Sequence, residues 1–324
     1  MKQNKFLSIL ISFSIVFILA FTSISQAAES TGYSGPSSSI KSGDYMYYSV
    51  YGDIYKVNVN TRKTSLVKNN QGGEIYNLTI KDGWIYYTLD KEGYGGCYDP
   101  YIYKVRTNGK DCKSLKRGYN PVVYNNKIYY IKLKSDPYGD LGIVGIYRMS
   151  LSGNSDTCIK KSSEISKFLV YKSNIYYITC DYLYGNGYLK RTSLSGSSTK
   201  TMTSSIDSDS DLQAYYDYIY FNVNGNIYKI KTTSTTKYKV KSNADLQDLS
   251  NGYVYYISSN KAYKMKLSTK STTRITSKTS VNDISVSGSY MILTYFTNSM
   301  NNTNKYFCTT SGKNGKLLKS YYSE

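Results

Sequence analysis

The chain has 324 residues, a formal net charge of +19 and 40 tyrosines, but no histidine and five cysteines. The lack of histidine excludes a Ser-His-Asp or Cys-His nucleophile and removes the commonest metal ligand. An odd cysteine count without metal-ligand spacing, in a chain long enough to build its own core, does not require a disulfide framework.

The N-terminal 27 residues predict a secretory signal peptide. Lys2 and Lys5 form a basic start, residues 6–21 are apolar, and residues 25–27 are a small-residue cleavage site. The apolar run is interrupted by serine, whereas a retained membrane anchor needs about 20 mostly apolar residues. We expect cleavage after residue 27, no membrane association afterwards, and a product that is secreted, extracellular or cell-wall associated.

From about residue 43 to residue 320 one unit recurs seven times. Its tyrosine-rich second strand is the clearest part, followed each time by a third strand such as "DIYKVNV", "YIYKVRT" or "NIYKIKT". A short alternating run precedes this pair and a lysine-bearing run follows it. The period is that of a four-stranded propeller blade. The second strands lie at residues 43–50, 82–89, 125–132, 172–179, 216–223, 251–258 and, less regularly, 287–294.

Residues 28–324 therefore predict a single all-β domain, a β-propeller of seven four-stranded blades. Six blades are the alternative, with the weak first or last copy completing a closure. Because successive side chains of a strand point to opposite faces, and both faces of a blade are covered, the tyrosine pairs should pack in the core. The first strand of the first copy is weak, with residues 35–40 its only candidate.

The repeat Gly-x-x-Tyr-Tyr followed by Ile-Tyr-Lys/Arg-hydrophobic resembles a bacterial secreted β-propeller domain of unknown function. That domain is similar to the propellers of low-density-lipoprotein-receptor-related proteins. The resemblance covers about Gly43 to Ser320 and implies the fold. The chain lacks the Tyr-Trp-Thr-Asp tetrapeptide of the receptor propellers, and Trp84 is its only tryptophan. No receptor ligand site is therefore carried over, since a fold does not fix a function.

Three long loops between second and third strands predict a binding rim on consecutive blades. They cover residues 90–100, 132–145 and 179–187, whereas the same loop is short in copies one, five and six. Tyrosines and aspartates among glycines in surface loops suit a glycan or a protein. Ordinary variation in loop length is the alternative. The rim candidates are Tyr94, Tyr98, Asp99, Tyr138, Asp140, Asp181, Tyr182 and Tyr184.

A second candidate set would ring the mouth of the central channel, which the first strands line. One residue near the middle of each second strand serves as its marker: Tyr48, Tyr87, Tyr130, Tyr177, Phe221, Tyr256 and Leu293. Counting back ten residues from each marker gives most of the set, with Asp245 one residue out of register. The residues could bind a small ligand or ion, or could satisfy strand ends and channel water. They are Asn77, Asn120, Lys167, Asp211, Asp245 and Asp283.

The segment "DSDSD" at residues 207–211 matches the opening of a calcium loop. It has Leu212 where that loop needs glycine and Tyr218 where it needs glutamate. We therefore assign no metal site, no cofactor and no catalytic residue.

Lysines concentrate in the third and fourth strands, as in residues 229–242, which predicts a basic outer belt around a neutral or acidic channel mouth. A basic surface favours acidic partners, although lysines on edge strands also discourage edge-to-edge pairing. Because we expect secretion, we do not expect a nucleic-acid partner.

We predict a secreted, monomeric, non-catalytic binding module of a Gram-positive cell envelope, for an anionic wall polymer, a glycan or a protein. One alternative is a carbohydrate-active enzyme, a lyase or glycosidase using rim carboxylates such as Asp99, Asp140 and Asp181. Glycoside hydrolysis would require two of them about 5–9.5 Å apart across a cleft. The other alternative is a structural wall or spore protein.

Overall fold

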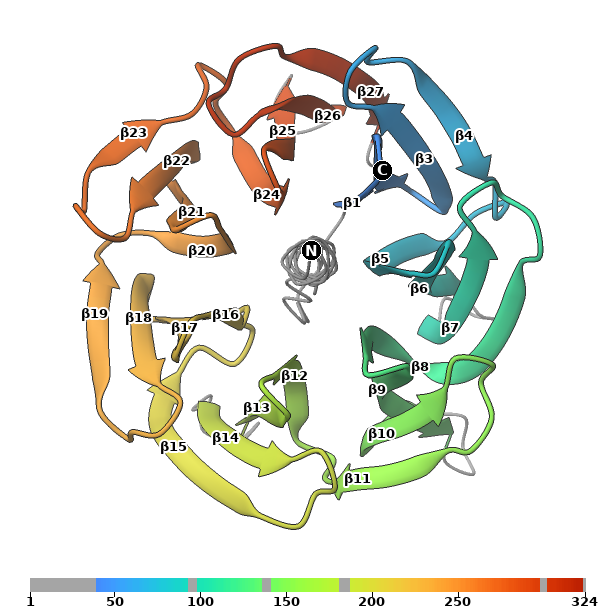
Figure 1. The fold of residues 1–324 in the computed structure, drawn as a ribbon, viewed down its shortest axis with the longest axis vertical. Coiled ribbons are helices and arrows are strands. Elements are labelled where there is room, and N and C mark those ends of the chain that lie inside the picture. The colour runs from blue at the N-terminus through green and yellow to red at the C-terminus, as the bar shows by residue number, and fades with distance from the viewer. Residues whose placement is uncertain (1–38, 93–97, 136–140, 181–186, 298–301, 323–324) are drawn as a thin grey trace, which may run out of the picture. The chain divides into compact units, whose positions relative to one another are not determined.

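The computed structural model describes residues 39–92, 98–135, 141–180, 187–297 and 302–322. These residues form 27 β-strands and no helix. The strands build antiparallel sheets arranged around a central axis, with the first strand of each sheet innermost and the last on the perimeter (Figure 1). The fold is a β-propeller, as predicted. Within the described ranges, no helix could cross a membrane.

Within each sheet, neighbouring strands follow each other in chain order. The first sheet contains β1 (Ser39–Ser42), β2 (Tyr45–Val50), β3 (Asp53–Asn58) and β4 (Thr64–Lys68). The second contains β5 (Glu74–Lys81), β6 (Trp84–Glu92), β7 (Tyr98–Arg106), β8 (Lys113–Tyr124), β9 (Lys127–Ser135), β10 (Leu141–Ser150) and β11 (Thr157–Lys161). The third contains β12 (Ile165–Tyr171), β13 (Asn174–Cys180), β14 (Gly187–Ser193) and β15 (Thr199–Ile206).

The remaining three sheets have four strands each. One contains β16 (Gln213–Tyr215), β17 (Tyr218–Val223), β18 (Asn226–Lys231) and β19 (Lys237–Lys241). The next contains β20 (Asp245–Ser250), β21 (Tyr253–Ser258), β22 (Lys261–Lys266) and β23 (Thr272–Arg274). The last contains β24 (Val281–Ser287), β25 (Tyr290–Thr297), β26 (Asn302–Thr309) and β27 (Lys316–Tyr322).

The seven-stranded sheet joins two blades through β8, a feature that the sequence analysis did not predict. The first part of β8 pairs with β7 as the outer strand of blade 2, and the part from Gly118 onwards pairs with β9 as the inner strand of blade 3. Gly118 has φ +145, and a Cβ there would lie 2.2 Å from the Ile131 carbonyl oxygen. Glycine thus lets one strand serve both blades. Counted in this way, the sheets give seven blades.

The first blade differs from expectation at its inner strand. We predicted residues 35–40, whereas β1 covers Ser39–Ser42, and residues 35–38 lie outside the described part. The segment "SIKS" pairs with β2, so the strand begins later and is shorter than most inner strands.

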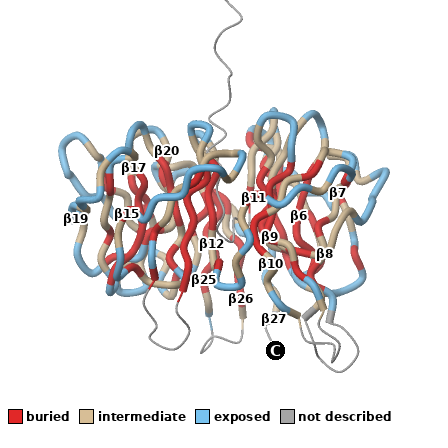
Figure 2. Tube along the Cα trace, turned by 90° about the horizontal axis from the view of Figure 1, so that it is seen from below, coloured by how far each residue is buried: buried red, intermediate tan, exposed pale blue. Residues whose placement is uncertain are grey.

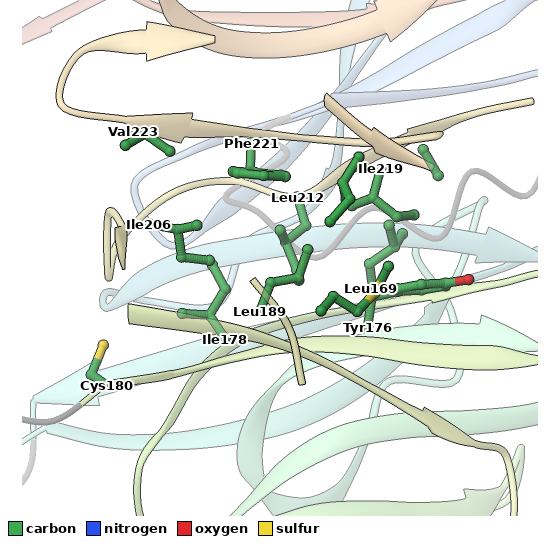
Figure 3. Packing of buried hydrophobic residues seen from close by; sticks show 13 residues of the cluster. Leu169, Tyr176, Ile178, Cys180, Leu189, Ile206, Leu212, Ile219, Phe221 and Val223 are labelled. Carbon is green, nitrogen blue, oxygen red and sulfur yellow. The ribbon is translucent and has the colours of Figure 1, made fainter. Parts of the chain in front are cut away.

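The tyrosine pairs form the core, as predicted. Tyr86 packs with Ile128 and Tyr130 of blade 3, whereas Tyr87 packs with Tyr47 and Ile54 of blade 1. Both rings are almost completely buried. Figure 3 shows an equivalent layer between β13–β14 and β17. Each buried aromatic side chain contributes about 1.5–3 kcal/mol of transfer free energy, so the interfaces between blades carry the fold. Figure 2 shows the buried residues in the middle of the strands and exposed residues at their ends.

The ring closes by packing of the last blade against the first. The Ser285 hydroxyl donates to the Ser39 carbonyl at 3.0 Å, and the Lys41 amide donates to the Ser287 hydroxyl at 3.1 Å. Nearby, Met46 and Tyr48 pack against Ile292 and Phe307. Among the described strands, no sheet combines the two ends of the chain.

Candidate functional site

Irregular first strands position the side chains of the channel mouth. A β-bulge inserts an extra residue into a strand and redirects its side chains. Five blades carry one in the first strand: between Tyr76 and Thr79, Tyr119 and Val122, Ile165 and Lys167, Leu246 and Asp248, and Val281 and Asp283.

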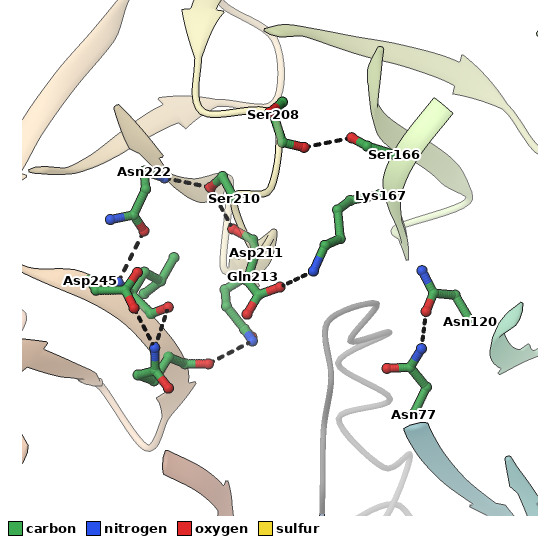
Figure 4. Close-up of polar contacts among 12 residues, drawn as sticks. Asn77, Asn120, Ser166, Lys167, Ser208, Ser210, Asp211, Gln213, Asn222 and Asp245 are labelled. Atoms are coloured by element: carbon green, nitrogen blue, oxygen red, sulfur yellow. Dashed lines mark hydrogen bonds and ion pairs between the residues drawn. The ribbon is translucent and has the colours of Figure 1, made fainter. Parts of the chain in front are cut away.

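Asn77 and Asn120 form a buried amide pair between blades 2 and 3. Both have left-handed backbone conformations, with φ of 57° and 56°, which asparagine tolerates better than most residues. The Asn77 Nδ2 donates to the Asn120 Oδ1 (Figure 4). The backbone N–H of Asn120 donates to the Thr88 hydroxyl at 3.1 Å, which fixes the second bulge. The structure thus brings together two of the predicted mouth residues.

Lys167 and Asp211 join blades 4 and 5. The Lys167 Nζ lies 2.9 Å from the Asp211 Oδ1, and both side chains are mostly buried. Beside this ion pair, the Ser166 hydroxyl donates to the Ser208 carbonyl at 2.7 Å (Figure 4). The lysine charge is therefore neutralised within the mouth.

Asp245 belongs to the same ring of positions, although the sequence placed it one residue out of register. It pairs with Ile257, as Lys167 pairs with Ile178 and Asp283 with Thr294. In each case the partner directly follows the second-strand marker. The offset arises because the bulge of β20 follows this position, whereas those of β12 and β24 precede it.

The mouth is acidic on the side of blades 5 to 7. Asp245 accepts a hydrogen bond from the Gln247 Nε2 at 2.8 Å. Solvent reaches part of Asp245, but partial burial of its carboxyl group raises its pKa to about 6. The neighbouring carboxylates of residues 211, 209 and 207 shift this pKa in the same direction. Asp248, absent from the predicted set, accepts from the amides of Val286 and Leu249, both at 2.7 Å. Burial outweighs these bonds and raises its pKa to about 8. The signal for Asp248 was the second aspartate in "DLQDLS".

Blade 7 contains a buried lysine that the sequence analysis also missed. Lys305 is 6% exposed, and its Nζ donates to the Thr294 hydroxyl at 2.8 Å. That hydroxyl donates to the Asp283 Oδ2 at 3.2 Å. Burial lowers the pKa of Lys305, and the Asp283 charge opposes this shift. The signal was "NKYFC" where the first copy reads "DIYKV". The residues paired at this position in the other blades are Ile54, Ile102, Ile146, Leu189, Ile227 and Ala262.

A cavity of about 320 Å³ lies between the first strands of blades 2 to 4. The Asn77 Oδ1 is buried at its edge and has no hydrogen-bond partner. Asp90 is 8% exposed and accepts from the Asp99 amide at 3.0 Å. Burial raises the pKa of Asp90 despite this bond, and Glu74 and Asp99 add to the shift. The lining consists of Tyr76, Asn77, Thr88, Asp90, Pro100, Tyr119, Asn120, Ser166 and Lys167.

Among the predicted rim residues, the structure places the side chain of Asp99 only. Its Oδ1 lies 2.9 Å from the Arg117 Nε, and its Oδ2 accepts from the Arg117 Nη2 at 3.1 Å. This two-point ion pair braces the β6–β7 hairpin against β8. Tyr98 belongs to β7, but its side chain lies outside the described part. The rim candidates that lie entirely outside it are Tyr94, Tyr138, Asp140, Asp181, Tyr182 and Tyr184.

Two aspartates of the "DSDSD" segment are engaged by other parts of the protein near the channel mouth. The Asp207 Oδ1 accepts from the Asn224 amide at 2.8 Å, and Asp211 binds Lys167. Within the described ranges, no group of three or more histidine, cysteine, aspartate or glutamate side chains could hold a metal ion.

Several third-strand cations are not free surface charges. The Lys104 Nζ donates to the Leu151 carbonyl at 2.9 Å, and the Lys264 Nζ donates to the Thr310 carbonyl at 2.7 Å. Arg191 makes the same contact, to the Thr232 carbonyl at 2.7 Å. Each bond reaches the next blade. Partial burial lowers the pKa of both lysines. These cations connect blades, so the predicted basic belt is narrower than the lysine count suggests.

The fourth strands form the perimeter, and their charges are of one sign. In all seven outer strands every charged residue is lysine or arginine. Of these cations only Arg117 forms an ion pair within the described residues. The cations are Lys68, Lys113, Lys116, Arg117, Lys160, Lys161, Lys200, Lys237, Lys239, Lys241, Arg274, Lys316 and Lys319.

Comparison with known proteins supports the fold. No family model and no curated protein matches the chain. It is similar to a chain of a nidogen/laminin complex, with 11% identity and a TM-score of 0.53 over 71% of this chain and 92% of that one. It is also similar to a puromycin-hydrolyzing peptidase of Mycobacterium tuberculosis, with 8% identity and a TM-score of 0.67.

The similarity spans only part of the peptidase, because it covers 91% of this chain but 55% of the peptidase chain. An oligogalacturonate lyase in complex with manganese shares 9% identity over 66% of this chain and 70% of its own, with a TM-score of 0.50. Identities this low show a shared propeller fold and nothing about activity.

Proposed function

We propose that this chain is a secreted binding module of a Gram-positive cell envelope that holds an anionic wall polymer against its perimeter. The observation that carries the proposal is the single sign of charge on all seven outer strands. Each exposed cation attracts a polyanion only weakly in water, and salt screens the attraction. Repetition around a rigid ring allows one polymer to make many contacts at once, which raises its overall affinity.

The acidic mouth supports the perimeter as the binding surface. Asp245, Asp211 and Asp283 lie at the axis, whereas the outer strands contain no acidic residue. A polyanion would be repelled from the side of blades 5 to 7 near the channel and attracted to the ring's edge. This separation of charge favours lateral contact with an extended polymer.

The contact made by Asp99 favours binding over hydrolysis. A glycosidase needs one carboxylic acid and one carboxylate facing the scissile bond. Both oxygens of Asp99 face the Arg117 guanidinium, so the carboxylate is already engaged within the protein. We therefore retain a non-catalytic, monomeric module as the proposal.

Sedimentation of residues 28–324 with purified Gram-positive cell walls tests this function. The variant Lys161→Gln/Lys200→Gln/Lys239→Gln removes three exposed cations from the outer strands of blades 3 to 5. We expect it to bind walls less tightly than the parent chain. The control Lys91→Gln/Lys127→Gln/Lys134→Gln removes the same charge from exposed second-strand positions and should bind as the parent does.

Walls stripped of their anionic polymer, and high salt, should each abolish binding. Equal binding by both triple variants, or binding that survives removal of the polymer, would contradict the perimeter as the binding surface. Thermal unfolding of each variant distinguishes lost affinity from lost structure.

A further inference from the structure

The cavity between blades 2 and 4 lies apart from the basic perimeter and has the composition of a ligand site. Its volume of about 320 Å³ is at the small end of the range for small-molecule pockets, about 300–1,000 Å³. Its wall comes from the first strands of three blades and from β6 and β7 of blade 2, and two of the three first-strand bulges direct asparagine side-chain amides towards it. A rigid frame therefore holds its polar groups.

One polar atom in this wall lacks a partner. Asn77 is 6% exposed, and its Nδ2 is used by Asn120, but its buried Oδ1 accepts no hydrogen bond from the protein. Figure 4 shows this oxygen on the side of the amide that faces away from Asn120. A buried acceptor without a partner is destabilising. A hydroxyl donor that entered the cavity would remove this destabilisation.

The remaining groups supply both donors and acceptors within one small space. The Thr88 hydroxyl already accepts a hydrogen bond from the backbone N–H of Asn120 and keeps its own proton to donate. Asp90 has an oxygen beyond the one that accepts the Asp99 amide. Alternating acceptors and donors suit a ligand whose hydroxyl groups do both.

The charges of the wall disfavour an ionic ligand. The Lys167 ammonium is neutralised by Asp211, so it offers little attraction to an anion. Asp90 lies near the carboxyl groups of Glu74 and Asp99, which disfavours an anion, and the Lys167 ammonium in the same wall disfavours a lone cation. Tyr76 and Tyr119 line the same cavity and offer apolar ring surface for C–H groups.

We propose that this cavity binds a single uncharged sugar residue, held by the amides of Asn77 and Asn120 and the carboxyl group of Asp90. The site is separate from the perimeter and does not depend on the polymer proposal. The sugar would bring hydroxyl groups for the unpartnered oxygen and a C–H face for the tyrosines.

Saturation-transfer NMR with residues 28–324 tests the ligand class. The neutral probes are glucose, galactose and N-acetylglucosamine, and the charged probes are glucuronate and glucosamine. We expect transfer to at least one neutral sugar and weaker transfer to both charged ones. No transfer to any neutral sugar, or equal transfer to glucuronate, would overturn the proposal.

A matched pair of variants tests the residues. Asn77→Gly removes the amide at a backbone position with φ of 57°, which glycine adopts without strain. We expect it to lower the affinity about tenfold, the effect of roughly one well-placed hydrogen bond. Asn126→Gly changes an exposed turn asparagine with nearly the same φ, 56°, and should leave the affinity unchanged.

A third readout does not depend on folding of the variants. In the parent chain, the side-chain amide NMR signals of Asn77 and Asn120 should shift when the neutral sugar is added. An unchanged affinity in Asn77→Gly, or unshifted amide signals in the parent chain, would place the sugar elsewhere and refute the site.

Discussion

Blades 3 and 7 differ at one row of residues that are paired across their first, second and third strands. The row is mostly apolar in blade 3 and polar in blade 7. In blade 3 the row runs from Tyr119 through Ile131 to Ile146, and both isoleucines are fully buried. In blade 7 the same row is an aspartate, a threonine and a lysine, Asp283, Thr294 and Lys305, which are joined by hydrogen bonds.

The difference shows what the repeat requires and where it tolerates an exception. A third-strand aliphatic residue needs only neighbours, whereas a buried ammonium needs an acceptor and a counter-charge. Blade 7 provides both in the two strands on the inner side of β26, so the exception involves three residues together. The row also places the lysine charge near the acidic mouth, where it offsets part of the carboxylate repulsion.

The largest effect should come from copying the lysine of blade 7 into blade 3. We expect Ile146→Lys to lower the free energy of unfolding by about 3–5 kcal/mol, because neither Ile131 nor Tyr119 offers a counter-charge. Ile146→Met keeps the volume and should cost less than about 1.5 kcal/mol. Denaturant unfolding measures both, and equal losses would show that the blade 3 row tolerates charge.

A smaller loss should follow from breaking the polar row of blade 7. Thr294→Val leaves the Lys305 ammonium buried without its acceptor and should cost about 1–3 kcal/mol. Adding Lys305→Met to that variant removes the stranded charge, so the double variant should be more stable than Thr294→Val alone. If the second substitution destabilises further, the lysine is not held through the threonine.

A lysine of another third strand should matter less. Lys264→Met loses the bond to the Thr310 carbonyl of the next blade, and we expect a loss of about 0.5–1.5 kcal/mol. Lys266→Met, at an exposed position two residues on, should remain within about 0.5 kcal/mol of the parent chain. Equal Tm values for the two variants would show that the bond between blades does not contribute to stability.

The smallest effect concerns pH and the acidic side of the mouth. The folded pKa of Asp245 is raised to about 6, above the unfolded value of about 3.9, so the folded state holds the extra proton between these values. Its contribution to stability is present below about pH 4 and falls as the pH rises to about 6. Thermal melts over this window should show a shallower decline for Asp245→Asn. Parallel curves for variant and parent would assign the decline to other carboxyl groups.

Sequence reasoning predicted the propeller because the packing positions repeat. Tyr86 and Tyr87 recur as a pair in most copies, and a pattern repeated along the chain reports on burial without any long-range information. The fusion of two blades through β8 could not be predicted in that way, since it depends on one local backbone conformation at Gly118.

The candidate site was predictable in its positions but not in its contacts. Counting from the markers found Asn77, Asn120 and Lys167, yet the partner that each one contacts depends on where each bulge falls. A bulge shifts the register by one residue and leaves no periodic trace, which is why Asp245 appeared misplaced. Lys305 was visible in the sequence only as a departure from the repeat.

The proposed function requires that the perimeter bind a polyanion through its outer-strand cations. The most direct test is the salt dependence of the affinity of residues 28–324 for the soluble anionic wall polymer, compared with Lys161→Gln/Lys200→Gln/Lys239→Gln. We expect the affinity to fall steeply with salt, and the variant to show both a lower affinity and a shallower slope. An affinity that is independent of salt and the same in the variant would contradict binding through the outer-strand cations.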